Sequence, residues 1–182
     1  MNLELNQRVA LVTGASQGIG RAIAAKLAQE GASVVLTARG EDRLNQVVSE
    51  IQAAGGKAIG VAADVSKKED CERLIQFTVE KFGKIDILIN NAGTSATGEF
   101  EAATDDIWQA DFDLKLFAAI RLSRLAIPYM KKQSWGRIIN LTNIGAKQPA
   151  AKTMPTTVTR AAGLALTKAL SKEYAANNIL VN

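Results

Sequence analysis

Three glycines in the segment 13–20, TGASQGIG, have a spacing that suits phosphate binding. Gly14 permits a tight turn, Gly18 lets a ligand approach the backbone, and Gly20 lets a following helix pack closely. An apolar β-branched run, 8–14, precedes the segment and an alanine-rich helical pattern follows it, so free amides at the helix N-terminus would face the ligand. A turn with only a structural role is the alternative. The predicted phosphate-binding loop consists of Gly14, Ser16, Gln17, Gly18, Ile19 and Gly20.

A second candidate site begins the helical pattern 155–170, PTTVTRAAGLALTKAL. Thr156 and Arg160 are spaced to project from one face of that helix. A threonine hydroxyl does not ionise near neutral pH, so it can orient a ligand oxygen but cannot exchange a proton as a phenol does. Arg160 can hold a ribose or an anion, and Asn143 in the preceding loop can donate to an oxyanion. In the structural alternatives, Thr156 is a first-turn helix residue and Arg160 pairs with a carboxylate.

Composition excludes several classes of function. The 182 residues carry a net charge of +4, contain no histidine and are 47% hydrophobic. The absence of histidine removes the commonest general base and most zinc sites, so we predict no metal. Scattered basic residues argue against nucleic-acid binding, and the lack of a long apolar run or a signal peptide predicts a cytoplasmic protein that does not bind membranes. The single cysteine, Cys71, is expected to be a packed thiol.

The elements that must position these residues alternate between strands and helices. Such alternation predicts an α/β fold with a doubly wound parallel sheet, a three-layer Rossmann fold forming a single NAD(P)-binding domain over residues 1–182. The apolar runs also suggest that helices cover both faces of every strand. The expected strands are 8–14, 33–39, 57–65, 84–93, 136–143 and 178–182, and the expected helices are 18–31, 41–56, 66–83, 105–132 and 155–170.

Four motifs in this order resemble those of the short-chain dehydrogenase/reductase family. They are TGASQGIG, ADV at the end of the third strand, NNAG at the end of the fourth and GRIIN in the fifth. The resemblance implies an oxidoreductase that transfers hydride between a nicotinamide and a small carbonyl or alcohol substrate. It also implies that Asp64 and Val65 hold the adenine, that Asn91, Ala92 and Gly93 line the cofactor cleft, and that the protein forms homo-oligomers.

The end of the second strand bears on the choice of cofactor. Ala38 stands where family members that use NAD tend to carry aspartate, and Arg39 follows as a planar cation suited to a 2′-phosphate. These residues favour NADP over NAD, although Glu41 and Asp42 weaken the local positive field. Alternatively, Arg39 simply points to solvent.

Aligned on the family motifs, all four usual catalytic positions are substituted. Thr156 stands at the tyrosine position, Arg160 at the lysine, Asn143 at the serine and Lys115 at the asparagine. No Tyr-x-x-x-Lys occurs elsewhere in the sequence. Burial next to Arg160 would lower the pKa of Lys115, which makes it a candidate replacement acid. Lys147 and Lys152 are further candidates, and the alternative for Lys115 is a solvated helix pair with Asp111.

Three functions are therefore open at this point. The chain is an oxidoreductase with a rebuilt site, an inactive NADP(H)-binding sensor or partner subunit, or a structural fragment. The last possibility arises because the sequence ends at Asn182, where the sixth strand has barely begun, so the C-terminal part of the family fold is expected to be absent. A helical stripe of Trp108, Phe112, Leu116 and Ala119 is expected to be either ordinary core or an oligomer contact.

Overall fold

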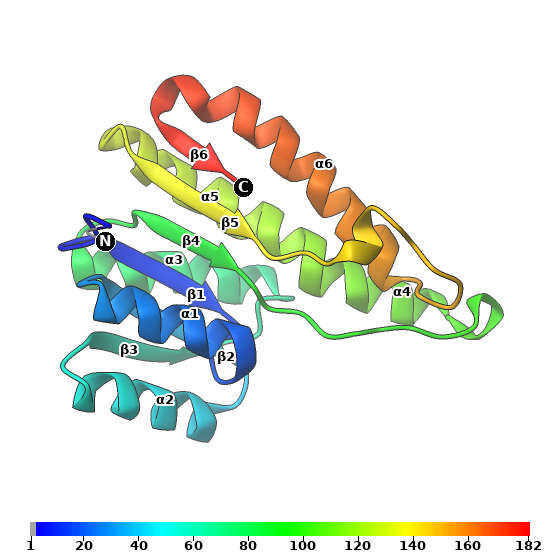
Figure 1. Cartoon of the computed structure of the whole chain (residues 1–182), viewed down its shortest axis with the longest axis horizontal. Helices are drawn as coiled ribbons and strands as arrows, with labels where there is room; N and C mark the ends of the chain where they lie inside the picture. Colours follow the sequence, from blue (N-terminus) through cyan, green and yellow to red (C-terminus); the bar gives the residue numbers. More distant parts are fainter. Residues whose placement is uncertain (1–2) are drawn as a thin grey trace.

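The computed structural model describes residues 3–182 and contains a six-stranded parallel sheet (Figure 1). The strand order is β3-β2-β1-β4-β5-β6, so the direction of winding reverses between β1 and β4. This topology confirms the predicted doubly wound α/β fold. The strands are β1 (Val9–Thr13), β2 (Ser33–Ala38), β3 (Lys57–Ala62), β4 (Ile87–Asn90), β5 (Gly136–Asn140) and β6 (Ile179–Val181).

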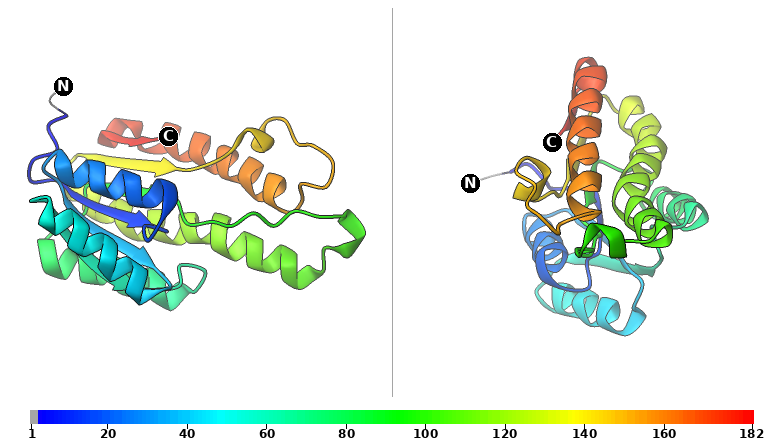
Figure 2. Two further views of the ribbon diagram at one scale, coloured as in Figure 1. Left: turned by 60° about the horizontal axis from the view of Figure 1, so that its bottom comes forward. Right: turned by 90° about the vertical axis from the view of Figure 1, so that its right-hand side faces the viewer.

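Helices lie on both sides of the sheet (Figure 2). The chain moves outward from β1 in one direction through β2 and β3, and in the other direction from β4 through β6. Right-handed crossovers therefore place α1 and α2 on one face and α3, α5 and α6 on the other. The helices are α1 (Gly18–Gln29), α2 (Glu41–Ala53), α3 (Lys68–Phe82), α4 (Asp105–Phe112), α5 (Ala118–Lys132) and α6 (Thr156–Tyr174), with short helical turns at η1 (Phe100–Ala102), η3 (Ile144–Ala146) and η4 (Ala175–Asn177). None of the helices within residues 3–182 combines the length and apolar character that a membrane span requires.

The expectation that both faces of every strand are covered is wrong for β5 and β6. Ile138 and Val181 are buried against α5 and α6, whereas Ile139 and Leu180, on the opposite face, are 41% and 43% exposed. The reason is topological, because both crossovers beyond β4 pass over the same face. Within the described residues, α1 and α2 cover the other face only around β1 to β4.

The predicted helix over 105–132 has the expected extent but is not uniform. A π-helical turn, η2 (Asp113–Phe117), joins α4 to α5, and the Ala118 amide donates to the carbonyl of Asp113 across it. Such single π turns within α-helices are rare and often occur at functional sites. The Trp108 and Phe112 rings stack 6.2 Å apart in α4. Of the predicted stripe, these two residues and Leu116 are half-buried and Ala119 is buried.

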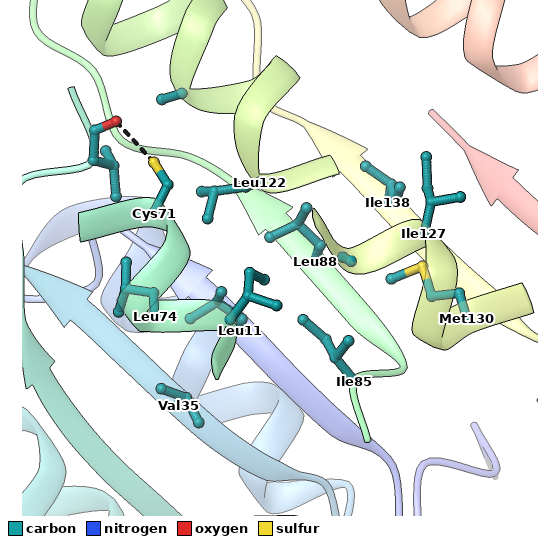
Figure 3. Close-up of a cluster of buried hydrophobic side chains, with 14 of the residues drawn as sticks. Leu11, Val35, Cys71, Leu74, Ile85, Leu88, Leu122, Ile127, Met130 and Ile138 are labelled. Carbon is teal, nitrogen blue, oxygen red and sulfur yellow. Dashed lines mark hydrogen bonds between the residues drawn. The ribbon is translucent and has the colours of Figure 1, made fainter. Parts of the chain in front are cut away.

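The core beneath α3 and α5 contains the single cysteine (Figure 3). The Cys71 thiol is fully buried and donates to the carbonyl oxygen of Val65 at 3.2 Å. Burial raises the pKa of this thiol to about 11. The expectation of a packed thiol is confirmed.

We expect Cys71 to resist thiol reagents in the native protein. With a pKa of about 11, only about one thiol in a thousand is ionised at pH 8, and the packed core also blocks access. An aromatic disulfide reagent should therefore react stoichiometrically only after denaturant is added. Because the sequence has one cysteine, the colour change has one source. Rapid reaction in native buffer would contradict the packing described here.

Candidate active site

A cavity of about 830 Å³ lies at the C-terminal ends of the strands. In the order of the sheet, Asp64 follows β3, Arg39 follows β2, the glycine loop follows β1, Asn91 follows β4 and Asn143 follows β5. From β2 to β5 are three strand spacings, or about 14 Å. The cavity is therefore an elongated crevice across the point where the winding reverses, where open α/β sheets bind ligands.

The glycine loop is shaped by its backbone conformations. Gly14 and Gly18 have φ values of +63° and +55°, which residues with a Cβ rarely adopt. Gly20 is buried behind the loop, and a Cβ there would lie 2.3 Å from the carbonyl oxygen of Gly14. No side chain caps the N-terminus of α1, since Gln17 makes no capping hydrogen bond. The first-turn amides of α1 therefore suit an anion.

Thr13 and Asn91 join the end of β1 to the end of β4. The Thr13 hydroxyl accepts hydrogen bonds from the amides of Asn91 and Ala92 at 2.9 and 3.0 Å. The Asn91 side chain donates to the carbonyls of Thr13 and Gly14 at 2.8 and 3.2 Å. Asn91, Ala92 and Gly93 all line the cavity. The Asn91 side-chain amide thus holds the start of the glycine loop in position through these two hydrogen bonds.

Charged residues line the cavity on the β2 and β3 side. Arg39 and Arg43 both line it, and Arg43 donates to the side-chain oxygen of Gln17 in the glycine loop at 3.2 Å. The Asp64 carboxylate accepts from the amide and hydroxyl of Ser66, which fixes its orientation beside Val65. Arg39 is exposed and therefore accessible to a ligand.

Thr156 is held at the opposite end of the cavity by hydrogen bonds to the chain. Its hydroxyl accepts from the Ala96 amide at 2.9 Å and from the Lys115 ammonium at 2.7 Å, and it donates to the Ala96 carbonyl at 2.9 Å. The Thr156 residue is only 4% exposed. Its hydrogen-bonding capacity is thus used within the protein, where it fastens the loop after β4 to the start of α6.

Lys115 and Asp111 form a buried ion pair behind Thr156. Both side chains are 1% exposed. The Lys115 ammonium donates to one Asp111 oxygen, and the Thr159 hydroxyl donates to the other at 2.6 Å. Burial and the charge of Arg160 lower the pKa of Lys115, while Asp111 opposes this shift. Lys115 pairs with Asp111, as in the alternative given for it, but the pair is buried instead of solvated because α6 packs across it.

Besides Thr156, the predicted polar residues that line this end of the cavity are Arg160 and Asn143. Arg160 is half-buried, and its guanidinium donates to the Leu141 carbonyl at 2.5 Å. Asn143 is exposed in the loop after β5. Lys115 does not line the large cavity; it borders a space of about 20 Å³ beneath Arg160.

The comparison with protein families settles the class of this fold. The family model described as short chain dehydrogenase matches residues 8–182. The chain belongs to the short-chain dehydrogenase family.

Other members of this oxidoreductase family are similar along nearly the whole chain. An uncharacterised oxidoreductase of Staphylococcus epidermidis is 36% identical over 178 residues, which are 98% of this chain and 76% of that protein. A metagenomic short-chain oxidoreductase solved in complex with NADP has a TM-score of 0.93 at 35% identity, covering 96% of this chain and 80% of that one. L-sorbose reductase from Gluconobacter frateurii, complexed with NADPH and L-sorbose, has a TM-score of 0.97 at 38% identity, covering 100% and 70%.

The structure of this short-chain dehydrogenase brings together most residues that the sequence pointed to. All the predicted cofactor-binding residues line the large cavity except Gly20, which supports the glycine loop from behind. Of the four residues that the sequence analysis aligns with catalytic positions, Thr156, Arg160 and Asn143 line it, and Lys115 lies behind Thr156.

The two alternative lysines lie away from the cavity of this short-chain dehydrogenase. Lys152 is exposed and pairs with Glu99 at 2.5 Å, and the Gly98 amide donates to the Lys152 carbonyl. Lys147 is also exposed, and neither lysine lines the large cavity. The loops after β4 and before α6 thus run side by side beyond the strand ends (Figure 2).

Sequence reasoning missed Arg43 and Thr159 as members of the site, and it considered Asp111 only as part of a solvated pair. Arg43 lies in the first turn of α2, four positions after Arg39, so a second arginine near the end of β2 was a usable signal. The roles of Asp111 and Thr159 depend on how α4 and α6 cross, and no local pattern encodes that contact.

Proposed function

We propose that this chain is an NADP(H)-binding oxidoreductase that moves hydride between the nicotinamide and a carbonyl or alcohol. The observation that carries the proposal is the crevice itself, which joins a glycine loop with open helix amides to two arginines beyond β2. Those amides suit a pyrophosphate, and Arg39 and Arg43 suit a 2′-phosphate. The NADP and NADPH complexes of two relatives support the same choice. NAD is the less favoured cofactor.

The proposed chemistry is non-standard because the usual tyrosine, lysine, serine and asparagine are replaced. When bound, the nicotinamide supplies or accepts the hydride. Asn143 and Arg160 are the chain's donors at this end of the cavity, and we assign Asn143 the stabilisation of charge on the reacting substrate oxygen. Thr156 positions the loop instead of donating a proton, because its hydroxyl is engaged with Ala96. Lys115 positions Thr156 and is not the direct acid, since it lies outside the large cavity.

The second candidate is a cofactor-binding sensor or partner subunit without turnover. One observation favours it. Among residues 3–182, no tyrosine, histidine, cysteine or lysine lines the large cavity. A side chain that exchanges protons near neutral pH is the usual means of acid catalysis. Binding the cofactor and catalysing the reaction thus require different groups. The groups expected to bind the cofactor are present, whereas the proton-exchanging side chain expected for catalysis is not among the described residues that line the cavity.

Titration with NADPH and NADH, followed by tryptophan fluorescence, tests cofactor binding, and assay of the loaded protein with carbonyls and alcohols tests turnover. Binding with turnover supports the oxidoreductase. Binding without turnover across the panel supports the sensor or partner subunit. Failure of both cofactors to bind at millimolar concentration would overturn both candidates.

We expect Arg39→Ala to reduce the affinity for NADPH by about 10-fold to 100-fold, the range of a charge-assisted hydrogen bond to a phosphate. Affinity for NADH should change by less than about 2-fold, because NADH lacks that phosphate. Calorimetric titration of both cofactors measures the ratio. Arg124→Ala, an exposed arginine on α5, is the matched control. An equal loss for both cofactors would reject the assignment of Arg39 to the 2′-phosphate.

A further inference from the structure

The positive charge of Arg160 has no carboxylate partner in direct contact among the described residues. Among the described residues, no carboxylate oxygen lies within 4.0 Å of its guanidinium, and its one hydrogen bond runs from Nη1 to the Leu141 carbonyl. The Asp111 carboxylate is occupied by Lys115 and Thr159. Asp111, Lys115 and Arg160 together therefore carry one net positive charge.

The position of Arg160 directs that charge into the large cavity. Its Nη2 would lie 2.5 Å from a Cβ placed on Gly93, so the guanidinium rests directly on the backbone after β4. Arg160 lines the cavity, and none of its nitrogens is among the fully buried groups that lack a partner. Its remaining N–H donors are therefore open to a ligand.

The two ends of the cavity differ in charge. On the β2 and β3 side, acidic side chains accompany the two arginines, namely Glu41, Asp42 and Asp64. On the β4 and β5 side, the lining residues other than Arg160 are all uncharged, and Asn91, Asn143 and Thr156 are among them. Arg160 is thus the one charged group lining this end within residues 3–182.

We propose that Arg160 binds a carboxylate of the substrate, which makes oxo acids and hydroxy acids the substrate class. This inference rests on the proposed function, because it assigns the substrate end of the same cavity. A planar guanidinium with free donors matches a carboxylate in two parallel hydrogen bonds, and partial burial strengthens them. Asn143 then lies nearby to donate to the reacting oxygen.

An anion at Arg160 has a second conceivable source in the pyrophosphate of the cofactor, and the experiment separates the two. The probes are phenylglyoxylate and its methyl ester, which share a reactive carbonyl but differ in the charge of the acid group. Their binding is measured by calorimetry, with NADPH-loaded protein and with protein free of cofactor. The variants are Arg160→Gln, which keeps an amide donor without the charge, and Arg124→Gln as the surface control.

We expect the wild-type protein and Arg124→Gln to bind phenylglyoxylate about 10-fold or more tightly than the ester, and Arg160→Gln to bind both alike. Equal affinity of the wild type for acid and ester overturns the proposal, whether or not the variant folds. A variant that loses NADPH affinity but keeps the preference for the acid assigns Arg160 to the cofactor and also overturns it. If NADPH does not bind, that result contradicts the proposed function and not the role of Arg160. The titrations of acid and ester without cofactor then still test whether Arg160 prefers the acid.

Discussion

Replacing Asp111 with alanine is expected to destabilise the protein by about 3–5 kcal/mol. The substitution removes the counter-ion of Lys115, whose side chain is 1% exposed and cannot regain water without opening the contact between η2 and α6. It also removes the acceptor of the Thr159 hydroxyl. Equilibrium denaturation in urea at neutral pH, followed by circular dichroism, measures the change in the free energy of unfolding.

Two further variants test the cause of that loss. Asp113→Ala removes a carboxylate from the same helical segment, but Asp113 is 27% exposed and pairs with a partly exposed Arg121, so we expect a cost below about 1 kcal/mol. Joining Asp111→Leu to Lys115→Met removes both charges, and should restore most of the lost stability. A loss below about 1 kcal/mol for Asp111→Ala would show that the pair does not behave as a buried one.

The second large effect is expected for Gly20→Ala, which should lower NADPH affinity by at least about 100-fold. The added Cβ would lie 2.3 Å from the Gly14 carbonyl oxygen and 2.5 Å from the Asn91 side-chain nitrogen. The loop backbone must shift to relieve these contacts, which misaligns several amides that we assign to the pyrophosphate. Each hydrogen bond to a charged group contributes about 1.5–3 kcal/mol, so losing two accounts for the expected change.

Gly163→Ala is the matched control for this substitution. Gly163 also lies in a helix, but a Cβ added there meets nothing within 4 Å among the described residues. We expect unchanged NADPH affinity and a gain in stability of about 0.5–1 kcal/mol, since alanine is the better helix former. Circular dichroism of Gly20→Ala must show a folded protein for the comparison to hold. Wild-type NADPH affinity in folded Gly20→Ala would refute the role given to this glycine.

Much of the fold could be predicted because its signals are local. The β-branched runs and helical patterns alternate without interruption, and each predicted strand overlaps an observed one. The exposed faces of Ile139 and Leu180 could not be predicted from apolar content, since the same residue types serve in covered and uncovered strands. Coverage depends on which side each crossover takes, which is a property of the whole sheet.

The cofactor end of the site was more predictable than the substrate end for a similar reason. Gly14 and Gly18 act through backbone conformation, so their residue type already carries the information. By contrast, the spacing of Asp111 and Lys115 predicts a pair but not its burial, because Thr156 and Thr159 reach it from a helix more than 40 positions later in the sequence. From the sequence alone, the Thr156 hydroxyl is a candidate ligand-binding group. Only the structure shows that it already donates a hydrogen bond to the Ala96 carbonyl.

The π-helical turn of η2 determines how α4 is rotated relative to α5. A π turn contains one residue more than the α-helical turn it replaces, so α4 and α5 differ in rotational phase by that one residue. If residues 113–117 became α-helical with no residue deleted, α4 would rotate by about 100° relative to α5. Asp111 would then leave the face that meets α6, while the core contacts of α5 stayed in place. Loss of the π turn without a deletion is thus equivalent to removing the ion pair, although it changes none of the side chains that form it.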